Sequence, residues 1–325
     1  MSNKELLRVE HLKKYFTVKR KMVSENLVLK AVDDVSFSIA EGEVLGLVGE
    51  SGCGKSTLGR AVIKIHSISD GDVYFKGQAI KDYGFRKMRE LRKDMQMIFQ
   101  DPYASLNPRM TVAEIVKGPL DVFEIGNRNK RLERVVEMLE TVGLSSEYLS
   151  KFPHEMSGGQ RQRVVIARAM ISNPSFVVCD EPVSALDVSV RAQVLNLMKD
   201  MQEQFNTAYL FISHDLSTVR YICDRIAVMY LGHIVEIAGS NELFDYPSHP
   251  YTMALLSSIP IPDVDQRRKR IILEGDVPSP IDPPKGCPFQ SRCTRCTKRC
   301  LEERPELMDI NGNGHLVACH LWKNI

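Results

Sequence analysis

Short apolar runs that end in glycine-rich or acidic turns mark the first two thirds of the chain. Residues 44–48, V-L-G-L-V, and residues 176–179, F-V-V-C, are apolar apart from one glycine, as expected of buried parallel strands. A similar run precedes His214 in L-F-I-S-H-D. Near the N-terminus, apolar residues alternate with polar ones and predict antiparallel strands with one buried face: Val35, Phe37 and Ile39.

Helical periodicity occupies the stretch between these strands. One set of apolar residues follows the spacing i, i+3, i+4, i+7, i+10 and predicts a helix with one buried face: Leu132, Val135, Val136, Leu139 and Val142. From Val164 onward, alanine and methionine favour a second helix. The alternation of strands and helices predicts an α/β fold.

The composition changes after about residue 245, where prolines exclude one continuous helix. We therefore expect a domain over residues 1–260 and a small, loop-rich C-terminal extension over residues 261–325. Residues 286–300, G-C-P-F-Q-S-R-C-T-R-C-T-K-R-C, place four cysteines close together, and Cys319 follows. This spacing suits a disulfide framework, a metal site or free thiols.

Composition and charge indicate the class of protein, and the expected compartment bears on the role of the cysteines. The chain has 325 residues, of which 43% are hydrophobic and 26% charged, as in ordinary globular proteins. A net charge of +2 gives no reason to expect a nucleic-acid partner. We find neither an apolar run long enough to span a membrane nor an N-terminal signal peptide. The expected compartment is the cytosol, where disulfides are rare.

The segment Gly49–Ser56 fits the pattern G-x-x-x-x-G-K-[ST] and lies between a predicted strand and a predicted helix. Backbone N–H groups of such a loop surround a phosphate, and the helix N-terminus adds positive charge. Lys55 would reach the β- and γ-phosphates, and the Ser56 hydroxyl would bind Mg²⁺. A chance match in a glycine-rich turn is the alternative. The expected nucleotide contacts are Gly49, Ser51, Gly52, Cys53, Gly54, Lys55, Ser56 and Thr57.

Cys53 lies inside this loop at a helix N-terminus, a position that favours a thiolate. We expect alkylation of Cys53 to block ATP binding and Mg-ATP to protect the thiol. An inert small residue is the equally open alternative.

Two acidic residues, Asp180 and Glu181, end the apolar run that starts at Phe176. Carboxyl ends of parallel strands face the ligand crevice of an open α/β sheet. Asp180 is placed to hold Mg²⁺, and Glu181 could accept a proton from an attacking water. Together with the glycine-rich loop, these residues predict binding of a nucleoside triphosphate with magnesium.

The segment M-S-G-G-Q-R-Q-R places Ser157 and two glycines at the start of a helix, a second candidate anion site. Here the chain resembles the ATP-binding cassette (ABC) family, whose signature motif is similar to Ser157-Gly158-Gly159-Gln160. Four further motifs resemble family elements in order: Phe16, or Tyr15, as the adenine-stacking aromatic; Gln100 as the Q-loop glutamine; Ser184-Ala185-Leu186-Asp187 as the D-loop; and His214 as the switch histidine.

This resemblance implies a P-loop ATPase with a RecA-like core, an N-terminal antiparallel β-subdomain and a helical signature subdomain over about residues 101–165. Two such domains would pair head to tail, with Ser157 and Gly159 of one closing over ATP on the other. Glu181 would act as general base, and His214 would position the γ-phosphate. Gln100 would contact Mg²⁺ and the attacking water.

The proline-rich tail and its cysteines resemble the ATPase subunits of oligopeptide and dipeptide importers. Several relatives bind a [4Fe–4S] cluster through cysteines at four matching positions: Cys287, Cys293, Cys300 and Cys319. Cys296 lies inside this pattern, and its spacing from Cys293 also suits zinc.

The function implied is ATP binding and hydrolysis that power peptide import. The implied partners are an identical or paralogous ATPase subunit, two membrane-spanning permeases and, indirectly, an extracytoplasmic peptide-binding protein. No nucleic-acid partner is implied. The protein would lie peripherally on the cytoplasmic face of the membrane, with D-P-Y-A-S-L-N-P after Gln100 near a permease coupling helix. The basic run at 266–270 could contact anionic lipids or form a solvated linker.

Alternative functions are a soluble ABC ATPase of DNA repair or translation, an importer ATPase for nickel or sugars, and a redox-sensing regulator.

Overall fold

The computed structural model describes residues 4–19, 26–259 and 271–322. Contacts within the chain divide it into two compact units, each built from discontinuous segments. The first unit comprises the described residues of Met1–Leu6, Ile39–Val44 and Asp82–Ile212. The second comprises those of Leu7–Ser38, Leu45–Lys81 and Ser213–Ile325. The predicted domain boundary at 260 and the basic run at 266–270 lie outside the described residues.

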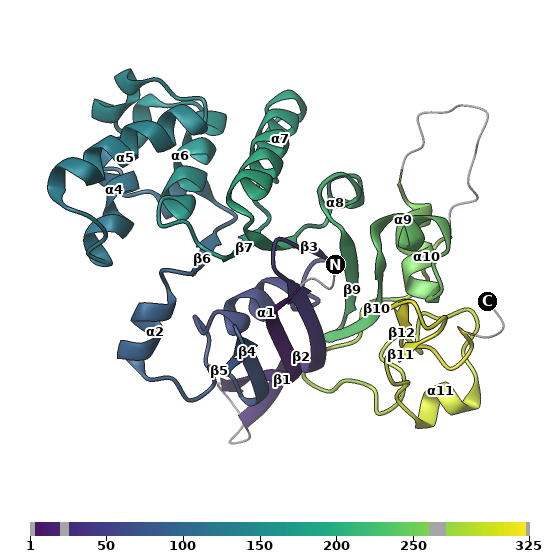
Figure 1. Ribbon diagram of the computed structural model, residues 1–325. Helices are drawn as coiled ribbons and strands as arrows, with labels where there is room; N and C mark the ends of the chain where they lie inside the picture. The colour runs from purple at the N-terminus through teal and green to yellow at the C-terminus, as the bar shows by residue number, and fades with distance from the viewer. Residues whose placement is uncertain (1–3, 20–25, 260–270, 323–325) are drawn as a thin grey trace. The chain divides into compact units, whose positions relative to one another are not determined.

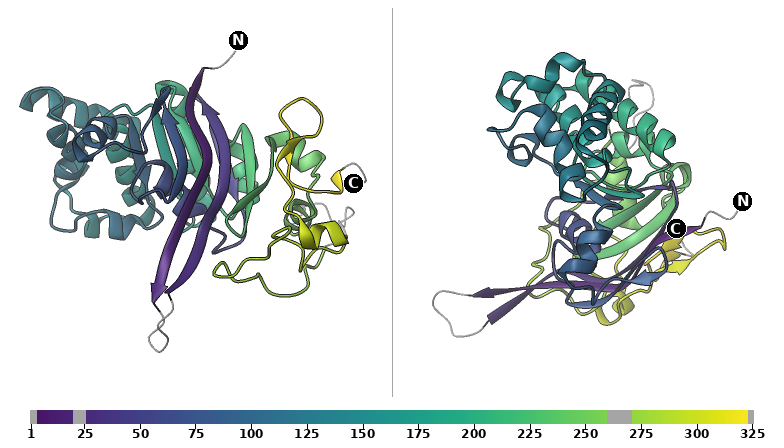
Figure 2. Two further views of the ribbon diagram at one scale, coloured as in Figure 1. Left: turned by 90° about the horizontal axis from the view of Figure 1, so that it is seen from below. Right: turned by 60° about the vertical axis from the view of Figure 1, so that its left-hand side comes forward.

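An antiparallel sheet contributes the N-terminal part of the second unit. Its strands are β1 (Glu5–Lys19), β2 (Asn26–Ala40), β4 (Asp70–Phe75) and β5 (Gln78–Ala79), in the order β2-β1-β4-β5. The long strands β1 and β2 run side by side in Figure 2. The predicted alternation is confirmed, because Val35, Phe37 and Ile39 are all buried. Polar residues between them leave one face of the strand apolar.

The second unit also contains five strands in the order β11-β12-β10-β9-β3. The predicted buried strand is β3 (Val44–Val48), which pairs in parallel with β9 (Arg225–Tyr230). Antiparallel pairing then adds β10 (His233–Gly239), β12 (Leu316–Val317) and β11 (Met308–Asp309). Strands β12 and β11 of the C-terminal extension are therefore added to the strands β3, β9 and β10. The glycine-rich loop follows β3.

Helices of the second unit are short. After β3 comes α1 (Lys55–Val62), and α8 (Leu216–Ile222) precedes β9. The tail contains α9 (Ser240–Asp245), α10 (Pro250–Ser257) and α11 (Lys298–Glu302). Pro247 lies between α9 and α10, and Pro250 is the first residue of α10, so the proline-rich tail is broken into short elements as predicted.

Three parallel strands lie in the first unit, in the order β8-β7-β6. They are β6 (Met95–Ile98), β7 (Phe176–Asp180) and β8 (Ala208–Ile212). Every residue of β7 and β8 is buried, which explains their continuous apolar character. The helix α7 (Val188–Phe205) connects these two strands.

The predicted helical subdomain is also part of the first unit. The predicted range, about residues 101–165, contains α3 (Pro102–Ser105), α4 (Val112–Val122), α5 (Arg128–Thr141) and the start of α6 (Gly158–Met170), with 3-10 turns at Ser146–Ser150 and Pro153–Glu155. The short helix α2 (Phe85–Leu91) precedes this range in the same unit. The helices α4, α5 and α6 pack against one another (Figure 1).

One detail of the helix predictions is corrected. Leu132 is 51% exposed and does not join the buried face of α5, where Met138 takes part beside Val135 and Leu139. The helix predicted to start at Ser157 and the two glycines is α6, which begins at Gly158 with Ser157 as its N-cap.

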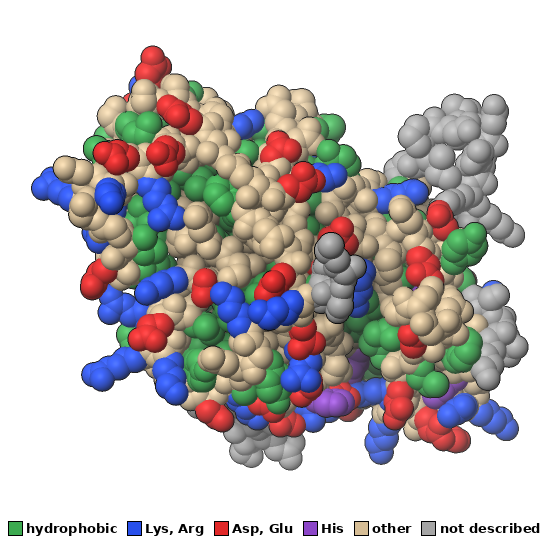
Figure 3. All heavy atoms as spheres, in the orientation of Figure 1, with side chains coloured by type: hydrophobic (Ala, Val, Ile, Leu, Met, Phe, Trp, Pro, Cys, Tyr) green, Lys and Arg blue, Asp and Glu red, His purple; other side chains and the backbone are tan. Residues whose placement is uncertain are grey.

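Acidic and basic side chains are interspersed on the face drawn in Figure 3, as the net charge of +2 leads one to expect. Among the described helices, none combines the length and apolar character needed to cross a membrane.

Candidate active site

The glycine-rich loop Gly49–Ser56 joins β3 to α1, as predicted. Two of its glycines are required by neighbouring backbone. A Cβ on Gly49 would lie 2.1 Å from the Met229 carbonyl oxygen, and one on Gly54 would lie 2.1 Å from that of Ala31. Both residues also have positive φ angles, 154° and 108°. Gly49 and Gly54 are therefore required by the backbone packing around the loop, whether or not a ligand is bound.

Lys55 is buried within this loop. Its Nζ donates hydrogen bonds to the carbonyl oxygens of Gly49, at 2.8 Å, and Glu50, at 2.9 Å. The helix α1 that starts here has no acidic residue in its first turn and no side-chain cap at Gly54. Such an end keeps the positive field that favours an anion. Ser56 and Thr57 belong to the first turn, and Ser51 and Gly52 lie at the exposed tip.

Of the two alternatives left open for Cys53, burial favours the unreactive thiol over the thiolate. The side chain is 4% exposed, and burial raises its pKa above the ordinary range of a thiol, although Lys55 nearby acts in the opposite direction. Desolvation of the charged form therefore outweighs the helix N-terminus and the lysine. The raised pKa of Cys53 favours the neutral thiol.

Tyr15 and Phe16, the two candidates for adenine stacking, have different surroundings in the second unit. The Tyr15 hydroxyl donates a hydrogen bond to Asp33, and burial and this carboxylate raise its pKa. The Phe16 ring meets the His66 ring edge-on at 5.6 Å between centroids. Both side chains are half-buried, so the choice of Phe16 stays a prediction.

His214 is exposed and belongs to the same unit as the glycine-rich loop. The preceding residue, Ser213, donates its backbone N–H to the Leu47 carbonyl at 3.2 Å. The following residue, Asp215, caps α8 by accepting from the N–H groups of Ser217 and Thr218. These contacts hold the backbone around His214 beside the end of β3, from which the loop starts.

In the first unit, the structure brings together two of the predicted catalytic residues. The Gln100 Nε2 donates to the Glu181 carboxylate at 2.9 Å. Gln100 follows β6 and Glu181 follows β7, and these strands are adjacent and parallel, so their carboxyl ends meet. Asp180 is the last residue of β7 and is fully buried.

The backbone at Glu181 is unusual. Its φ of 49° lies in the left-handed region, which non-glycine residues seldom adopt. Its N–H donates to the Ile212 carbonyl at 3.0 Å, and its own carbonyl accepts from the Ser184 N–H at 3.3 Å. Eight other described non-glycine residues also have positive φ, so this backbone conformation alone does not mark Glu181 as functional. The sequence contained no signal for it.

The signature segment Ser157–Gln160, the second candidate anion site, forms the N-terminus of α6, where its own side chains cap the helix. The Ser157 hydroxyl accepts from the Gln160 N–H at 3.3 Å, and the Gln160 side chain accepts from the Ser157 N–H at 2.9 Å. This capping box satisfies two donors. A Cβ on Gly159 would lie 2.4 Å from the Val190 Cγ1 in α7, so close helix packing also requires this glycine.

Asp187 of the predicted D-loop caps α7. Its exposed carboxylate accepts from the Val190 N–H at 3.0 Å and from the Ser189 hydroxyl at 3.1 Å. The aspartate thus has a local structural role that the motif alone did not indicate.

The cysteine segment contains buried and half-buried free thiols. Burial, together with the neighbouring cysteines, raises the pKa of Cys287 to about 12, and that of Cys293 and Cys319 in the same direction. The thiols therefore lie within electrostatic reach of one another. Nevertheless, across residues 4–19, 26–259 and 271–322 no three His, Cys, Asp or Glu side chains are arranged to hold a metal ion. The donor type fits a cluster, but the arrangement does not.

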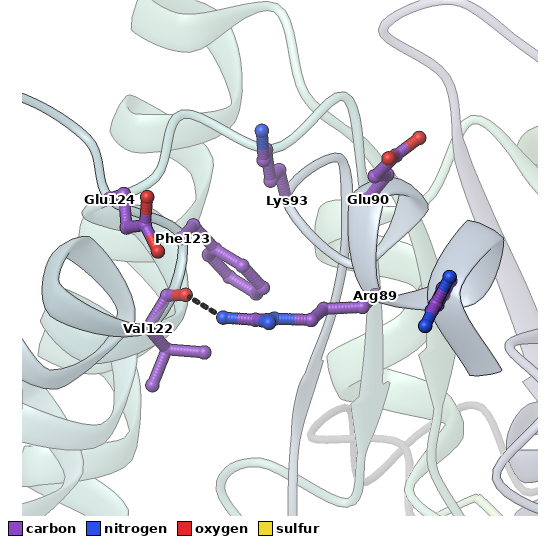
Figure 4. A pocket seen from close by; sticks show the side chains of 7 residues that line it. Arg89, Glu90, Lys93, Val122, Phe123 and Glu124 are labelled. Atoms are coloured by element: carbon purple, nitrogen blue, oxygen red, sulfur yellow. Dashed lines mark hydrogen bonds between the residues drawn. The ribbon is translucent and has the colours of Figure 1, made fainter.

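Figure 4 shows a pocket of about 320 Å³ in the first unit, between α2 and the end of α4. Its lining mixes basic, acidic and apolar side chains: Arg86, Arg89, Glu90, Lys93, Val122, Phe123 and Glu124. The Arg89 guanidinium donates to the Val122 carbonyl at 2.9 Å, which links the two helices.

Sequence reasoning passed over Glu50, although it lies inside the loop. Its side chain pairs with Arg292, and its backbone N–H donates to the Tyr251 hydroxyl. These partners are 242 and 201 residues away in sequence, and no local pattern announces them.

Known proteins are similar to this chain over almost its whole length. The model of the family described as "ABC transporter" matches residues 32–184, and that described as "Oligopeptide/dipeptide transporter, C-terminal region" matches residues 235–300. The chain is 50% identical to the oligopeptide transport ATP-binding protein AppF of Bacillus subtilis, over 98% of this chain and 97% of the relative. It is 48% identical to the dipeptide transport ATP-binding protein DppF of Haemophilus influenzae, over 98% and 97% respectively.

The fold also matches solved structures. The dimeric bacterial ABC transporter cassette MJ0796 superposes with a TM-score of 0.64 at 28% identity, covering 72% of this chain and 99% of that one. The ABC transporter component cbiO1 of Clostridium perfringens gives the same TM-score at 27% identity, covering 75% and 92%. These matches confirm the predicted α/β ABC ATPase fold. Full-length similarity to transport proteins leaves no support for a repair or translation ATPase. The chain therefore belongs to the ABC transporter ATPases, in the oligopeptide/dipeptide transport family.

Proposed function

We propose that this protein binds and hydrolyses ATP to drive import of dipeptides or oligopeptides through a membrane ABC transporter. The observation that carries the proposal is the loop Gly49–Ser56, in which Lys55 is held by backbone carbonyls at the start of a helix. Nickel and sugars remain the alternative cargoes. Similarity near 50% to oligopeptide and dipeptide transport proteins favours peptides.

In this proposal the residues of the predicted ATP motifs have separate roles. The loop N–H groups and Lys55 bind the triphosphate, and His214 positions the γ-phosphate. The adenine ring stacks on Phe16, or on Tyr15. Magnesium offsets the phosphate charge, and Ser56, Gln100 and Asp180 would hold it. The Gln100 side chain, bonded to Glu181, orients the attacking water, and Glu181 accepts its proton.

We further propose that two ATPase subunits close over the nucleotide. The partner is an identical chain or a paralogue. Ser157, Gly159, Gln160 and Asp187 would then face the nucleotide held by the other subunit. A ligand that contacts both subunits only in the closed state favours closure, and hydrolysis removes that preference. The dimeric form of the similar cassette MJ0796, also solved in a post-hydrolysis state with ADP and phosphate, supports this scheme.

The assembly proposed around these subunits has two membrane-spanning permeases and, indirectly, an extracytoplasmic peptide-binding protein. The ATPase lies on the cytoplasmic face as a peripheral subunit. The loop after Gln100, which contains α3, would contact a permease coupling helix. Tyr103 in this loop is 62% exposed, with the Arg161 guanidinium 3.6 Å from the centroid of its ring.

Replacing Glu181 with Gln tests the catalytic assignment. We expect steady-state ATP hydrolysis by the purified importer to fall at least about 100-fold, because the variant cannot accept the proton of the attacking water. In ATPase subunits purified without the permeases, retained ATP should also trap a closed pair, detectable as a doubled mass by size-exclusion chromatography with multi-angle light scattering. The matched control, Glu203→Gln at an exposed position in α7, should hydrolyse ATP normally. Turnover by Glu181→Gln within a few-fold of the unmutated rate would exclude Glu181 as the base.

For the cysteine segment we propose a [4Fe–4S] cluster with a structural role, held by Cys287, Cys293, Cys300 and Cys319. Zinc, with Cys296 among its ligands, is the alternative. Thiolates suit both. The cluster would be far in sequence from the ATP motifs, which favours a structural role over electron transfer.

Anaerobic purification followed by assays of iron, acid-labile sulfide and zinc tests this assignment. We expect four irons and four sulfides per chain, visible absorption that a reductant bleaches, and retention of the cluster in Cys296→Ser but not in Cys300→Ser. One zinc per chain, lost in Cys296→Ser, would support the alternative. Chains that bind neither metal would refute both and leave free thiols.

A further inference from the structure

One residue of the glycine-rich loop is held by the C-terminal extension. The Arg292 Nη1 approaches both carboxylate oxygens of Glu50, at 3.1 Å and 2.8 Å. The side chain of Arg292 is 9% exposed and that of Glu50 28% exposed, so solvent screens this pair less than an ordinary surface ion pair. Both residues belong to the second unit.

The backbone of the same residue is fixed as well. The Glu50 N–H donates to the Tyr251 hydroxyl at 2.8 Å, and the Glu50 carbonyl accepts from Lys55 at 2.9 Å. Tyr251 comes from α10 and is fully buried. Glu50 therefore contacts Lys55 of the loop, Tyr251 of α10 and Arg292 of the extension.

An aromatic cluster anchors the segment that carries Arg292. Phe289, three residues earlier, is buried, with ring centroids 5.2 Å from Tyr230 and 5.4 Å from Tyr251. Tyr230 ends β9, the strand beside β3. Because these rings hold position 289 against the core, the Arg292 side chain has a fixed base from which to reach the loop.

The extension makes further contacts close to the predicted adenine site. The Lys30 N–H donates to the Pro280 carbonyl at 3.0 Å, and the Arg304 guanidinium lies 3.5 Å from the carboxylate of Asp33. Asp33 in turn accepts from the Tyr15 hydroxyl. The extension is thus in contact with the loop and with the residues beside it.

Charge explains why such a contact matters for a nucleotide. A triphosphate is strongly anionic, and an unpaired Glu50 carboxylate inside its binding loop would repel it. Arg292 offsets that charge and ties the carboxylate down. We propose that Arg292 is a positioning residue, through which the cysteine-containing extension sets the affinity of the loop Gly49–Ser56 for ATP. This inference rests on the proposed ATP binding and adds the extension as part of its machinery.

Equilibrium binding of Mg-ATP to the purified full-length chain tests the inference, for example by competition with a fluorescent ATP analogue. We expect Arg292→Ala to raise the Kd about tenfold, equivalent to about 1.4 kcal/mol. Arg292→Lys should recover part of the affinity because it restores a point charge without the planar fork. The matched control is Arg295→Ala, an exposed arginine three residues along, which should change the Kd less than about twofold.

A double-mutant cycle separates positioning from general damage. In the Glu50→Gln background no unpaired carboxylate remains, so we expect Arg292→Ala to change the Kd less than about twofold. An equal effect in both backgrounds, or no effect of Arg292→Ala in the native background, would overturn the inference. Failure of the unmutated chain to bind ATP would instead refute the proposed function. If Arg292→Ala does not fold, Arg292→Gln and Arg292→Lys replace it, with far-ultraviolet circular dichroism as the check.

Discussion

At the scale of single residues, burial rather than motif position decides the chemistry of Cys53. A cysteine at a helix N-terminus, beside a lysine, is expected to ionise easily. In this protein the thiol is 4% exposed, and desolvation raises its pKa despite Lys55. For Gly54 in the same loop, the motif and the structure agree. The motif predicts a glycine at this position, and the nearby carbonyl of Ala31 leaves no room for a Cβ atom.

The raised pKa of Cys53 leads to a prediction for alkylation. We expect iodoacetamide to modify Cys53 slowly at pH 7.5 and faster as the pH rises past 9, because only the thiolate reacts and the raised pKa delays its formation. Peptide mass spectrometry at a series of pH values measures the rates, with urea-unfolded protein as reference and Cys53→Ser to verify the peptide. Mg-ATP should slow the reaction further. Labelling at pH 7.5 as fast as in urea would contradict this description.

At the scale of secondary structure elements, β12 of the extension is attached by backbone pairing and by a buried charged group. The strand pairs with β10, in which Glu236 is fully buried. His315, just before β12, lies 2.8 Å from Glu236 and 3.1 Å from Glu242. Burial lowers the pKa of His315, but the hydrogen bonds and charges of these carboxylates outweigh it, and the net shift is upward.

This shift predicts how stability depends on pH. A histidine whose pKa is raised by folding stabilises the protein below its unfolded pKa of about 6.5, and this contribution is lost as the pH rises through the folded value. We therefore expect the free energy of unfolding of the native chain, relative to His315→Gln, to fall between pH 6 and pH 9. Urea unfolding at several pH values provides the measurement. A difference between the two proteins that is independent of pH would contradict the assignment.

At the scale of the whole molecule, the compact units do not follow the order of the chain. The extension, 271–322 in the described structure, belongs to the same unit as the glycine-rich loop, whereas Gln100, Ser157, Asp180 and Glu181 belong to the other. A sequence-based division into residues 1–260 and 261–325 remains a prediction, because its boundary lies outside the described residues. Within the second unit, the contact between Arg292 and Glu50 joins the extension to the glycine-rich loop.

Much of the fold could be predicted because its signals are local. The apolar run at 44–48 became β3, and the run before Asp180 became β7, since a strand buried on both faces needs uninterrupted apolar residues. The face of α5 was only partly correct: Leu132 continues the apolar spacing, yet it is exposed. Apolar periodicity therefore predicted the helix correctly. It did not predict which residues of the apolar face are buried, because burial depends on the neighbouring helices.

The amino-acid sequence by itself determined the α/β class, the glycine-rich loop, the residues of the ATP motifs and the family resemblance, because each depends on residue types at short, fixed spacings. Only the tertiary structure decided that Cys53 is buried, with its pKa raised, and that Glu181 has a left-handed backbone. It alone placed Arg292 on Glu50. Burial, backbone strain and pairing over 242 residues arise from packing, which no local pattern of residues encodes.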